Sequence, residues 1–216
     1  MPSLRLIYDR LFRTWGPQGW WPARSPFEMM VGAILTQATS WHNVERAIEN
    51  LRRAGALQPK NMLALRTSRL RRLIRPAGFF RQKTRRLKAF SDWYVRRYRG
   101  SPAQMFRTPW RVLRGELLSL YGIGPETADA ILLYAGGQPV FVVDAYTARV
   151  FRRHRLIGAR AGYAEIQQVA MRQLPRDTAL YNAYHALLVE VGKRHCHRTA
   201  PDCTHCPLGD LPHTLR

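Results

Sequence analysis

Apolar residues recur along this chain at the spacing of helices rather than of strands. Two groups show it most clearly, Ala128, Ile131, Leu132 and Ala135, and Tyr184, Leu187, Leu188 and Val191. Positions i, i+3, i+4 and i+7 lie on one face of an α-helix, so each group gives a helix an apolar face to bury. Both segments are therefore predicted to be helices packed against a core.

Residues typical of helix ends indicate where three further helices begin or end. Ser25 and Pro26 suit an N-cap and a first turn, and predict a helix through residues 27–37. Glycines at 55 and 100 are expected to end helices over residues 43–53 and 85–98. Only residues 139–144 (PVFVVD) have strand character, and a single strand makes no sheet. We expect an all-α fold.

The composition is that of a folded protein. The chain has 216 residues, of which 46% are hydrophobic and 11% aromatic, enough to bury a core in one large domain or two small lobes. No apolar run reaches the length of a membrane span. Charges interrupt every apolar group of the opening residues MPSLRLIYDRLFR, so no secretory signal is predicted. We expect a cytoplasmic protein without a membrane partner.

The charge indicates a polyanionic partner. Lys and Arg number 35 against 14 Asp and Glu, a formal charge of +21. A protein with many dispersed cations binds the phosphates of a nucleic acid favourably, because binding releases condensed counterions. A GC-rich genome explains the preference for Arg over Lys, but not the excess of cations over acids. A membrane surface is a weaker alternative, because no basic amphipathic helix stands apart from the folded segments.

A glycine turn precedes one of the predicted helices, in residues 120–135 (LYGIGPETADAILLYA). Gly122 and Gly124 allow positive φ and close backbone approach, and Pro125 suits the first helical turn. Free N–H groups at the helix start favour an anion, so the backbone alone could bind a phosphate. An ordinary corner between two helices is the alternative interpretation.

Several motifs in order resemble one enzyme family. The pattern L-x-G-I-G-x-x-T-A-x-x-I, followed by V-V-D at 142–144, resembles the helix-hairpin-helix and Gly/Pro-Asp signature of base-excision DNA glycosylases. Residues 25–51, 75–90 and 196–206 resemble the opening helices, the segment before the hairpin and the iron–sulfur loop of the endonuclease III branch. The resemblance covers most of the chain.

The resemblance implies a two-lobed helical fold. One lobe is a six-helix barrel over residues 21–138 that ends in the helix-hairpin-helix at about 113–135. The other joins residues 1–20 to 139–216 and carries the catalytic aspartate and the Cys-rich loop 196–213. The implied partner of this monomer is double-stranded DNA with damaged bases, in a prokaryotic nucleoid. The hairpin residues implied to bind DNA, together with a monovalent cation, are Gly122, Ile123, Gly124 and Thr127.

Asp144 falls at the family's catalytic position. Breaking a glycosidic bond of deoxyribose develops positive charge on the sugar, which a carboxylate can stabilise while it orients or deprotonates an attacking water. The alternative is that Asp144 only caps the helix that begins at Ala145.

Glu126 is a departure from the bifunctional members of the family. These carry a lysine two positions after the second glycine, and its amine forms a Schiff base with the sugar. Glu126 cannot form an imine. The substitution predicts a monofunctional glycosylase with water as nucleophile, although Glu126 itself could simply be a first-turn acid that suits the helix dipole.

Aromatic motifs narrow the resemblance to the 3-methyladenine DNA glycosylase III subgroup. They imply a base pocket at Trp20, Trp21, Pro22 and Trp41, wedges at Gln37 and Phe79, and phosphate contacts at Arg81, Lys83, Arg85 and Arg86. Aromatic walls favour a cationic alkylated purine such as 3-methyladenine, and a wedge fills the stack that a flipped base vacates. The tryptophans could instead pack between the two lobes, the two wedge residues could pack within the helices, and the cations could belong to a solvated surface.

The cysteines follow the family's cluster spacing in part. Cys196, Cys203 and Cys206 match the first three ligands of a [4Fe–4S] cluster, but Pro212 stands at the fourth position. The nearby candidates for a non-cysteine ligand are His213, His205 and Asp210. Zinc would also suit three cysteines and a histidine, and a loop without metal is the third possibility. Disulfides are not expected of three cysteines in a cytosolic protein.

The sequence thus predicts a base-excision-repair DNA N-glycosylase that acts on alkylated purines. Two alternatives within the class are removal of mismatched thymine or uracil and removal of oxidised pyrimidines. An alternative of another class is a non-catalytic protein that binds DNA lesions or junctions. A nuclease is disfavoured, because no acidic cluster suited to two metal ions is present.

Overall fold

The structure is a computed structural model that describes residues 2–215. Every regular element in this range is a helix, which confirms the predicted all-α class. Residues 139–144 are extended but belong to no strand. The chain divides into two compact units, which we call the central unit (residues 21–138) and the terminal unit (residues 1–20 and 139–216). Each unit is described by itself.

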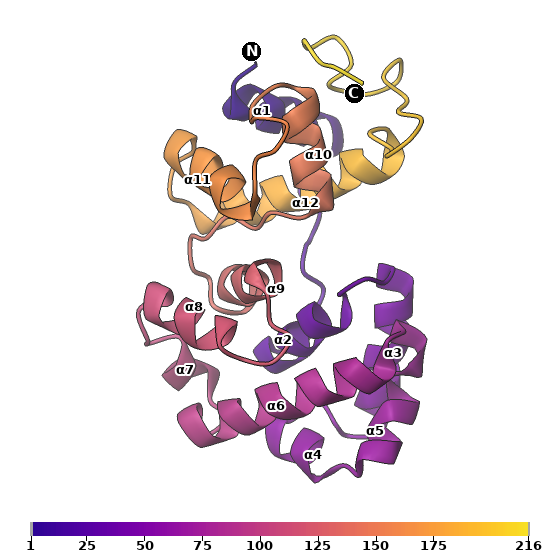
Figure 1. The fold of residues 1–216 in the computed structure, drawn as a ribbon, viewed down its shortest axis with the longest axis vertical. Helices are drawn as coiled ribbons and strands as arrows, with labels where there is room; N and C mark the ends of the chain where they lie inside the picture. Colours follow the sequence, from indigo (N-terminus) through magenta and orange to yellow (C-terminus); the bar gives the residue numbers. More distant parts are fainter. Residues whose placement is uncertain (1, 216) are drawn as a thin grey trace. The chain divides into compact units, whose positions relative to one another are not determined.

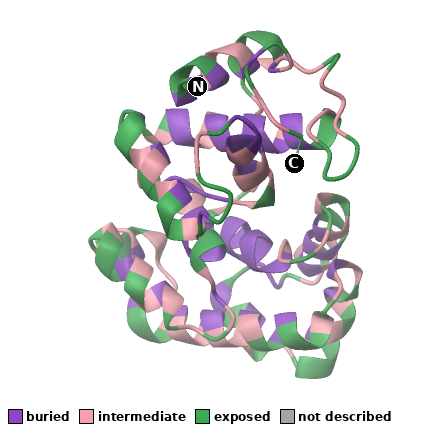
Figure 2. Cartoon of the chain, turned by 45° about the horizontal axis from the view of Figure 1, so that its top comes forward, coloured by how far each residue is buried: buried purple, intermediate pink, exposed green. Residues whose placement is uncertain are grey.

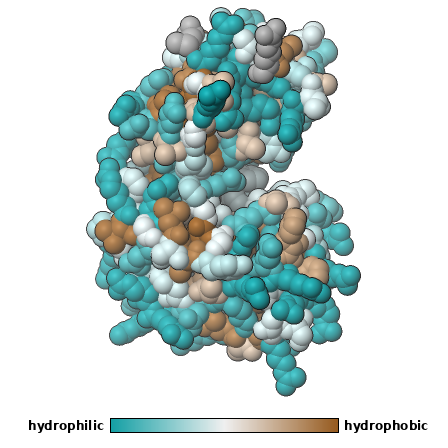
Figure 3. Space-filling view, viewed as in Figure 1, coloured by the Kyte–Doolittle hydropathy of each residue, from teal (hydrophilic) through white to brown (hydrophobic). Residues whose placement is uncertain are grey.

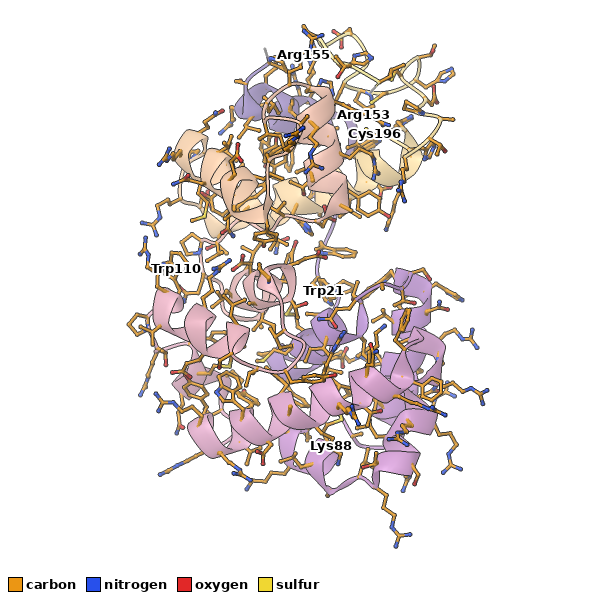
Figure 4. All side chains as sticks on the ribbon, viewed as in Figure 1. Trp21, Lys88, Trp110, Arg153, Arg155 and Cys196 are labelled. Atoms are coloured by element: carbon orange, nitrogen blue, oxygen red, sulfur yellow. The ribbon has the colours of Figure 1, made fainter. Side chains whose placement is uncertain are left out.

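The central unit packs its helices around α2 and α6 (Figure 1). Its elements are α2 (Pro26–Leu35), α3 (Trp41–Arg53), α4 (Pro59–Ala64), α5 (Thr67–Leu73), the 3-10 turn η1 (Arg75–Ala77), α6 (Phe80–Tyr98), α7 (Pro102–Met105), α8 (Trp110–Leu118), α9 (Pro125–Ala130) and the π-helical turn η2 (Ile131–Ala135). Helix α6 contacts α2, α4, α5 and α7. Its Lys88 donates to the carbonyls of Met62 and Leu65, at 3.0 and 2.6 Å, and so closes the end of α4 (Figure 4).

The predicted cap of α2 is present. The Ser25 hydroxyl accepts a hydrogen bond from the Glu28 N–H at 3.1 Å, and Pro26 occupies the first turn. Residues Phe27–Leu35 are all buried, so α2 is the centre of this unit's core. The other two predicted helices begin earlier than expected, at Trp41 and Phe80. The two-residue shift of α3 is within the usual variation of helix ends, whereas α6 begins five residues early, directly after the left-handed Phe79.

The terminal unit is built on its last helix. Its elements are α1 (Leu4–Trp15), α10 (Ala145–Arg153), α11 (Tyr163–Gln173) and α12 (Thr178–Arg194), followed by an irregular segment. Helices α1 and α10 pack on α12, which Figure 2 shows as largely buried. The Tyr184 hydroxyl of α12 donates to the Leu4 carbonyl of α1 at 2.9 Å. This contact ties the start of the chain to its last helix.

The surface agrees with the composition. Hydrophilic side chains prevail on the face of each unit that Figure 3 shows. Among residues 2–215, no helix combines the length and the apolar composition that crossing a bilayer requires.

Candidate active site and cysteine loop

Asp144 lies where a buried extended segment meets α10. Residues 140–143 are buried, and Asp144 caps the helix by accepting the Thr147 N–H at 2.7 Å through Oδ1. The other oxygen, Oδ2, lies 3.5 Å from Nε2 of His185 on α12. The side chain of Asp144 is only 11% exposed. The predicted capping role is thus confirmed, and one oxygen of the carboxylate takes no part in it.

The partners of Asp144 keep it charged despite its burial. Loss of hydration raises the pKa of this carboxyl, but the nearby His185 imidazole and the backbone and hydroxyl groups of Thr147 outweigh it, so the pKa lies below its ordinary value. Sequence reasoning missed His185. The only signal was a polar residue inside the apolar pattern of α12, and such a residue gives no indication of which side chain it faces.

The glycine turn is held by a network of side chains. Gly122 has φ +76°, and a Cβ there would lie 2.3 Å from Nε of Arg86. The Gln37 amide nitrogen donates to the Gly122 carbonyl at 3.0 Å and to Oγ1 of Thr127 at 2.8 Å. Arg86 donates to the amide oxygen of Gln37. Positive φ and close approach are therefore confirmed at Gly122. The amide nitrogen of Gln37, the predicted wedge, is thus bonded to the hairpin, and its amide oxygen is bonded to Arg86 of α6.

Gly124 differs from Gly122. Its φ is −96°, so the positive φ that a glycine allows is not used at this position. No atom lies within 4 Å of where its Cβ would stand, so the backbone faces open space at the start of α9. The side chains of Ile123 and Thr127 are buried, which leaves only their backbone groups for a DNA contact. Glu126 is exposed in the first turn of α9.

Asp129, the next acid of the same motif, has a structural role. Its side chain has no exposed surface and accepts two hydrogen bonds from Arg114, at 2.6 and 3.0 Å. The pair joins α8 to α9, the two helices of the hairpin. Such a two-point guanidinium–carboxylate pair fixes geometry as well as charge.

Three of the four predicted base-pocket residues line one cavity in the central unit. Trp21, Pro22 and Trp41 form aromatic and apolar walls around a space of about 270 Å³. The two indole rings meet edge to face at 5.1 Å, and the bare backbone of Gly32 lies under Trp21, where a Cβ would be 3.3 Å from the ring. Trp20 does not line this cavity. It belongs to the terminal unit, where the Lys193 ammonium lies 5.9 Å from its ring.

The cavity is acidic although the protein is basic. Glu28, Glu45 and Glu49 line it against a single cation, Arg52. Arg52 pairs with Glu28 at 2.8 Å and with Glu49. Within residues 2–215, no hydrogen bond or ion pair engages the Glu45 carboxylate. A cavity of aromatic rings and excess negative charge suits a flat cation.

The predicted DNA contacts of α6 separate into two kinds. Arg81 and Arg85 are exposed, and Phe79 is 63% exposed in a left-handed conformation before the helix. Lys83 has no exposed surface, and its amine donates to the carbonyls of Leu35 and Ala77, at 2.9 and 2.7 Å. This burial lowers its pKa to about 8. The predicted phosphate contact of Lys83 is therefore wrong, because helical periodicity turns it inward between the two arginines.

The three cysteines line one cavity of about 20 Å³ in the terminal unit. Arg153 of α10 donates to the Cys196 sulfur at 3.0 Å (Figure 4) and to the His197 carbonyl at 2.8 Å, so it anchors the loop. Burial, and the nearby thiols, raise the pKa of Cys206 to about 11. No three His, Cys, Asp or Glu side chains of residues 2–215 are arranged to hold a metal ion as they stand.

The candidates for a fourth ligand have different positions. His213 lines the cavity, and its Nδ1 contacts the Leu211 carbonyl at 2.8 Å. A nitrogen against a carbonyl must carry the proton, which leaves Nε2 of His213 as the basic nitrogen. His205 is exposed and bound to Asp202, and Asp210 is exposed and paired with Arg10. Neither of these two lines the cavity.

Comparison with known proteins agrees with this geometry. Residues 31–176 match the family model described as "HhH-GPD superfamily base excision DNA repair protein". The chain is 47% identical over 207 residues to "Putative DNA repair glycosylase MJ1434" of Methanocaldococcus jannaschii, covering 95% of this chain and 93% of the relative.

Two solved structures have a similar fold. A non-covalent endonuclease III–DNA complex has a TM-score of 0.84 at 24% identity and covers 98% of this chain and 96% of its own. An H. pylori 3-methyladenine DNA glycosylase (MagIII) bound to 1,N6-ethenoadenine has a TM-score of 0.74 at 29% identity, covering 87% and 96%. The chain belongs to the HhH-GPD superfamily of base excision DNA repair proteins, in its endonuclease III branch.

Proposed function

We propose that this protein is a monofunctional DNA N-glycosylase that removes cationic alkylated purines, such as 3-methyladenine, from double-stranded DNA. The observation that carries the activity is Asp144, a largely buried carboxylate with an 11% exposed side chain, which its partners keep ionised and which has one oxygen outside the helix cap. It stands at the position of the family's catalytic aspartate.

Asp144 acts on the sugar. As the bond from C1′ to the base nitrogen breaks, its electron pair leaves with the base, and positive charge develops on the sugar. The carboxylate stabilises this charge and accepts a proton from the water whose oxygen bonds to C1′. A quaternised purine leaves as a neutral base, so this reaction needs no general acid on the leaving group.

Glu126 supports hydrolysis by water rather than by an amine. It is the exposed first-turn residue of α9, at the position where bifunctional relatives have the imine-forming lysine. We expect no covalent adduct when the protein is treated with borohydride on abasic DNA, under conditions in which a lysine-bearing endonuclease III is trapped. A robust adduct would contradict the monofunctional assignment.

The cavity of the central unit supports the choice of substrate. Its tryptophans offer π faces, and its carboxylates add negative charge that a cationic base would meet. The similarity to a 3-methyladenine glycosylase points to the same class of lesion. Neutral oxidised pyrimidines and mismatched thymine would gain nothing from the acidic wall.

The hairpin and α6 supply the proposed contacts to the DNA backbone. The open backbone at Gly124 would contact one phosphate. The exposed side chains of Arg81 and Arg85 would contact others. Phe79, exposed and fixed in a left-handed conformation, is the proposed wedge. We propose that the backbone of the hairpin also binds a monovalent cation when DNA is present.

A release assay across oligonucleotides tests the function. Duplexes that carry an alkylated purine, an oxidised pyrimidine, uracil or a thymine mismatch are incubated with the protein, and the free base is measured. We expect release from the alkylated duplex. Release confined to oxidised pyrimidines or to mismatches would replace the substrate assignment, and tight lesion binding without any release would favour a non-catalytic role.

We also propose that the cysteine loop holds a [4Fe–4S] cluster through Cys196, Cys203, Cys206 and Nε2 of His213. The cavity that these four residues share supports this proposal. The bound cluster would order the loop. Anaerobically purified protein is expected to contain iron and sulfide and to absorb visible light, whereas His213→Ala should lower the iron content. A colourless, iron-free protein would overturn the proposal.

A further inference from the structure

The two oxygens of the Asp144 carboxylate meet different groups. Oδ1 accepts the Thr147 N–H of its own helix at 2.7 Å, as an N-cap does. Oδ2 faces Nε2 of His185 at 3.5 Å, from the neighbouring helix α12. His185 is itself buried. A buried histidine is thus directed at the one oxygen of Asp144 that capping leaves for chemistry.

The cations of α10 are bound to groups other than Asp144. On α10, Arg149 donates to the carbonyls of Cys196 and Gly192, and Arg152 donates to the Ala161 carbonyl. Arg153 is bound to the cysteine loop. Helix α12 packs on α10 and contributes His185. Among residues 2–215, His185 is the one titratable side chain that acts on the Asp144 carboxyl.

The electrostatics of this pair favour a proton on Nε2 of His185. A bare Nε2 would direct its lone pair at an anionic oxygen, and the two would repel each other. A protonated Nε2 points an N–H at Oδ2, which favours the anion strongly in a poorly hydrated site. The 3.5 Å separation is longer than an ordinary hydrogen bond, and catalytic hydrogen bonds of free enzymes commonly shorten only with substrate bound.

We propose that His185 is a positioning residue for Asp144: its Nε2–H fixes Oδ2 and keeps the carboxylate ionised in its buried site. This inference rests on the proposed catalytic role of Asp144. Without the imidazole, the carboxylate would keep only the backbone and hydroxyl groups of Thr147, while burial continued to favour the neutral acid. The neutral acid can neither stabilise a sugar cation nor accept a proton from water.

Two substitutions separate the donor from the bulk of the side chain. His185→Met removes the donor and keeps an adaptable apolar filler, and His185→Gln keeps a neutral N–H donor. Single-turnover base release is measured from alkylated DNA across pH. We expect the acid limb of the His185→Met profile to move up by about one pH unit or more, with DNA affinity unchanged, and His185→Gln to restore most of the lost rate. Tyr184→Phe, which loses a buried hydrogen bond of the same helix, is the matched control and should keep the wild-type limb.

The outcomes of this experiment distinguish the two proposals. If Asp144→Asn still releases the base, the proposed function of Asp144 fails. If Asp144→Asn is inactive but His185→Met has the wild-type profile, only the inference about His185 is wrong. Nitrogen-15 NMR of the wild-type protein near neutral pH gives a test that needs no variant: a proton on Nε2 of His185 supports the inference, and a bare Nε2 overturns it.

Discussion

Three acids of one short sequence segment have three different environments. Asp129 is buried and paired with Arg114, so its charge holds the two helices of the hairpin together. Glu126 is exposed at the start of α9. Asp144 is buried, yet capping uses only one of its oxygens. Of the three carboxylates, only that of Asp144 is both desolvated and left with an oxygen for chemistry, which is what stabilisation of a cation requires.

The first prediction at this scale concerns Asp144→Asn. The amide keeps a capping oxygen for the Thr147 N–H, so the helix should form, but the charge is lost. We expect base release to fall by on the order of a hundredfold to a thousandfold, as when other electrostatic groups are removed from active sites. Binding to DNA with an uncleavable abasic analogue should not change. Full activity in this variant would mean that another group stabilises the sugar.

The second concerns Glu45, which lines the aromatic cavity without a partner among the described residues. Glu45→Gln removes one negative charge and changes the shape little. Because the site is open to water, we expect a modest loss of a few-fold in release of a cationic purine, and no loss with the neutral base 1,N6-ethenoadenine. Glu165→Gln, an exposed acid on α11, is the control. Equal losses on the cationic purine and on 1,N6-ethenoadenine would show that the charge of Glu45 does not favour the cationic base.

At the scale of elements, apolar periodicity and capping residues predicted several of the helices but not their contacts, nor the π-helical turn of Ile131–Ala135. Ser25, Pro26 and the apolar face of α2 specify that helix locally, and the structure has it. Gly122 and Gly124 looked equivalent in the sequence. They differ because Arg86, a residue distant in the chain, packs against only one of them. His185 was missed for the same reason, since local sequence does not encode which helices meet.

The two glycines make a matched pair for the third prediction. Gly122→Ala places a Cβ at φ +76° against Arg86 and should destabilise the protein by about 1–3 kcal/mol, seen as a lower Tm. Gly124→Ala has an ordinary φ and open space, so its Tm should stay close to that of the wild type. It should instead weaken DNA binding, because the new methyl group stands where a phosphate would approach. If the two variants had the same Tm and the same DNA affinity, the proposed difference between the two glycines would be wrong.

At the scale of the whole molecule, the sequence predicted a nucleic-acid partner from charge alone, and the family match agrees with it. Charge composition reports the average surface and not the position of a given residue. Lys83 illustrates this limit, because it lies in a basic segment but its amine is buried against two backbone carbonyls. Which cations face DNA follows from helix phase and packing together.

The salt dependence of DNA binding tests that distinction. Each phosphate contact that is lost should reduce the slope of log K against log salt by about 0.9. We expect Arg81→Ala and Arg85→Ala each to reduce it by close to this amount, since both side chains are exposed on α6. Lys83→Met should lower the Tm, because two buried carbonyls lose their donor, but should leave the slope unchanged. A reduced slope for Lys83→Met, or unchanged slopes for both arginine variants, would mean that DNA does not meet this face of α6.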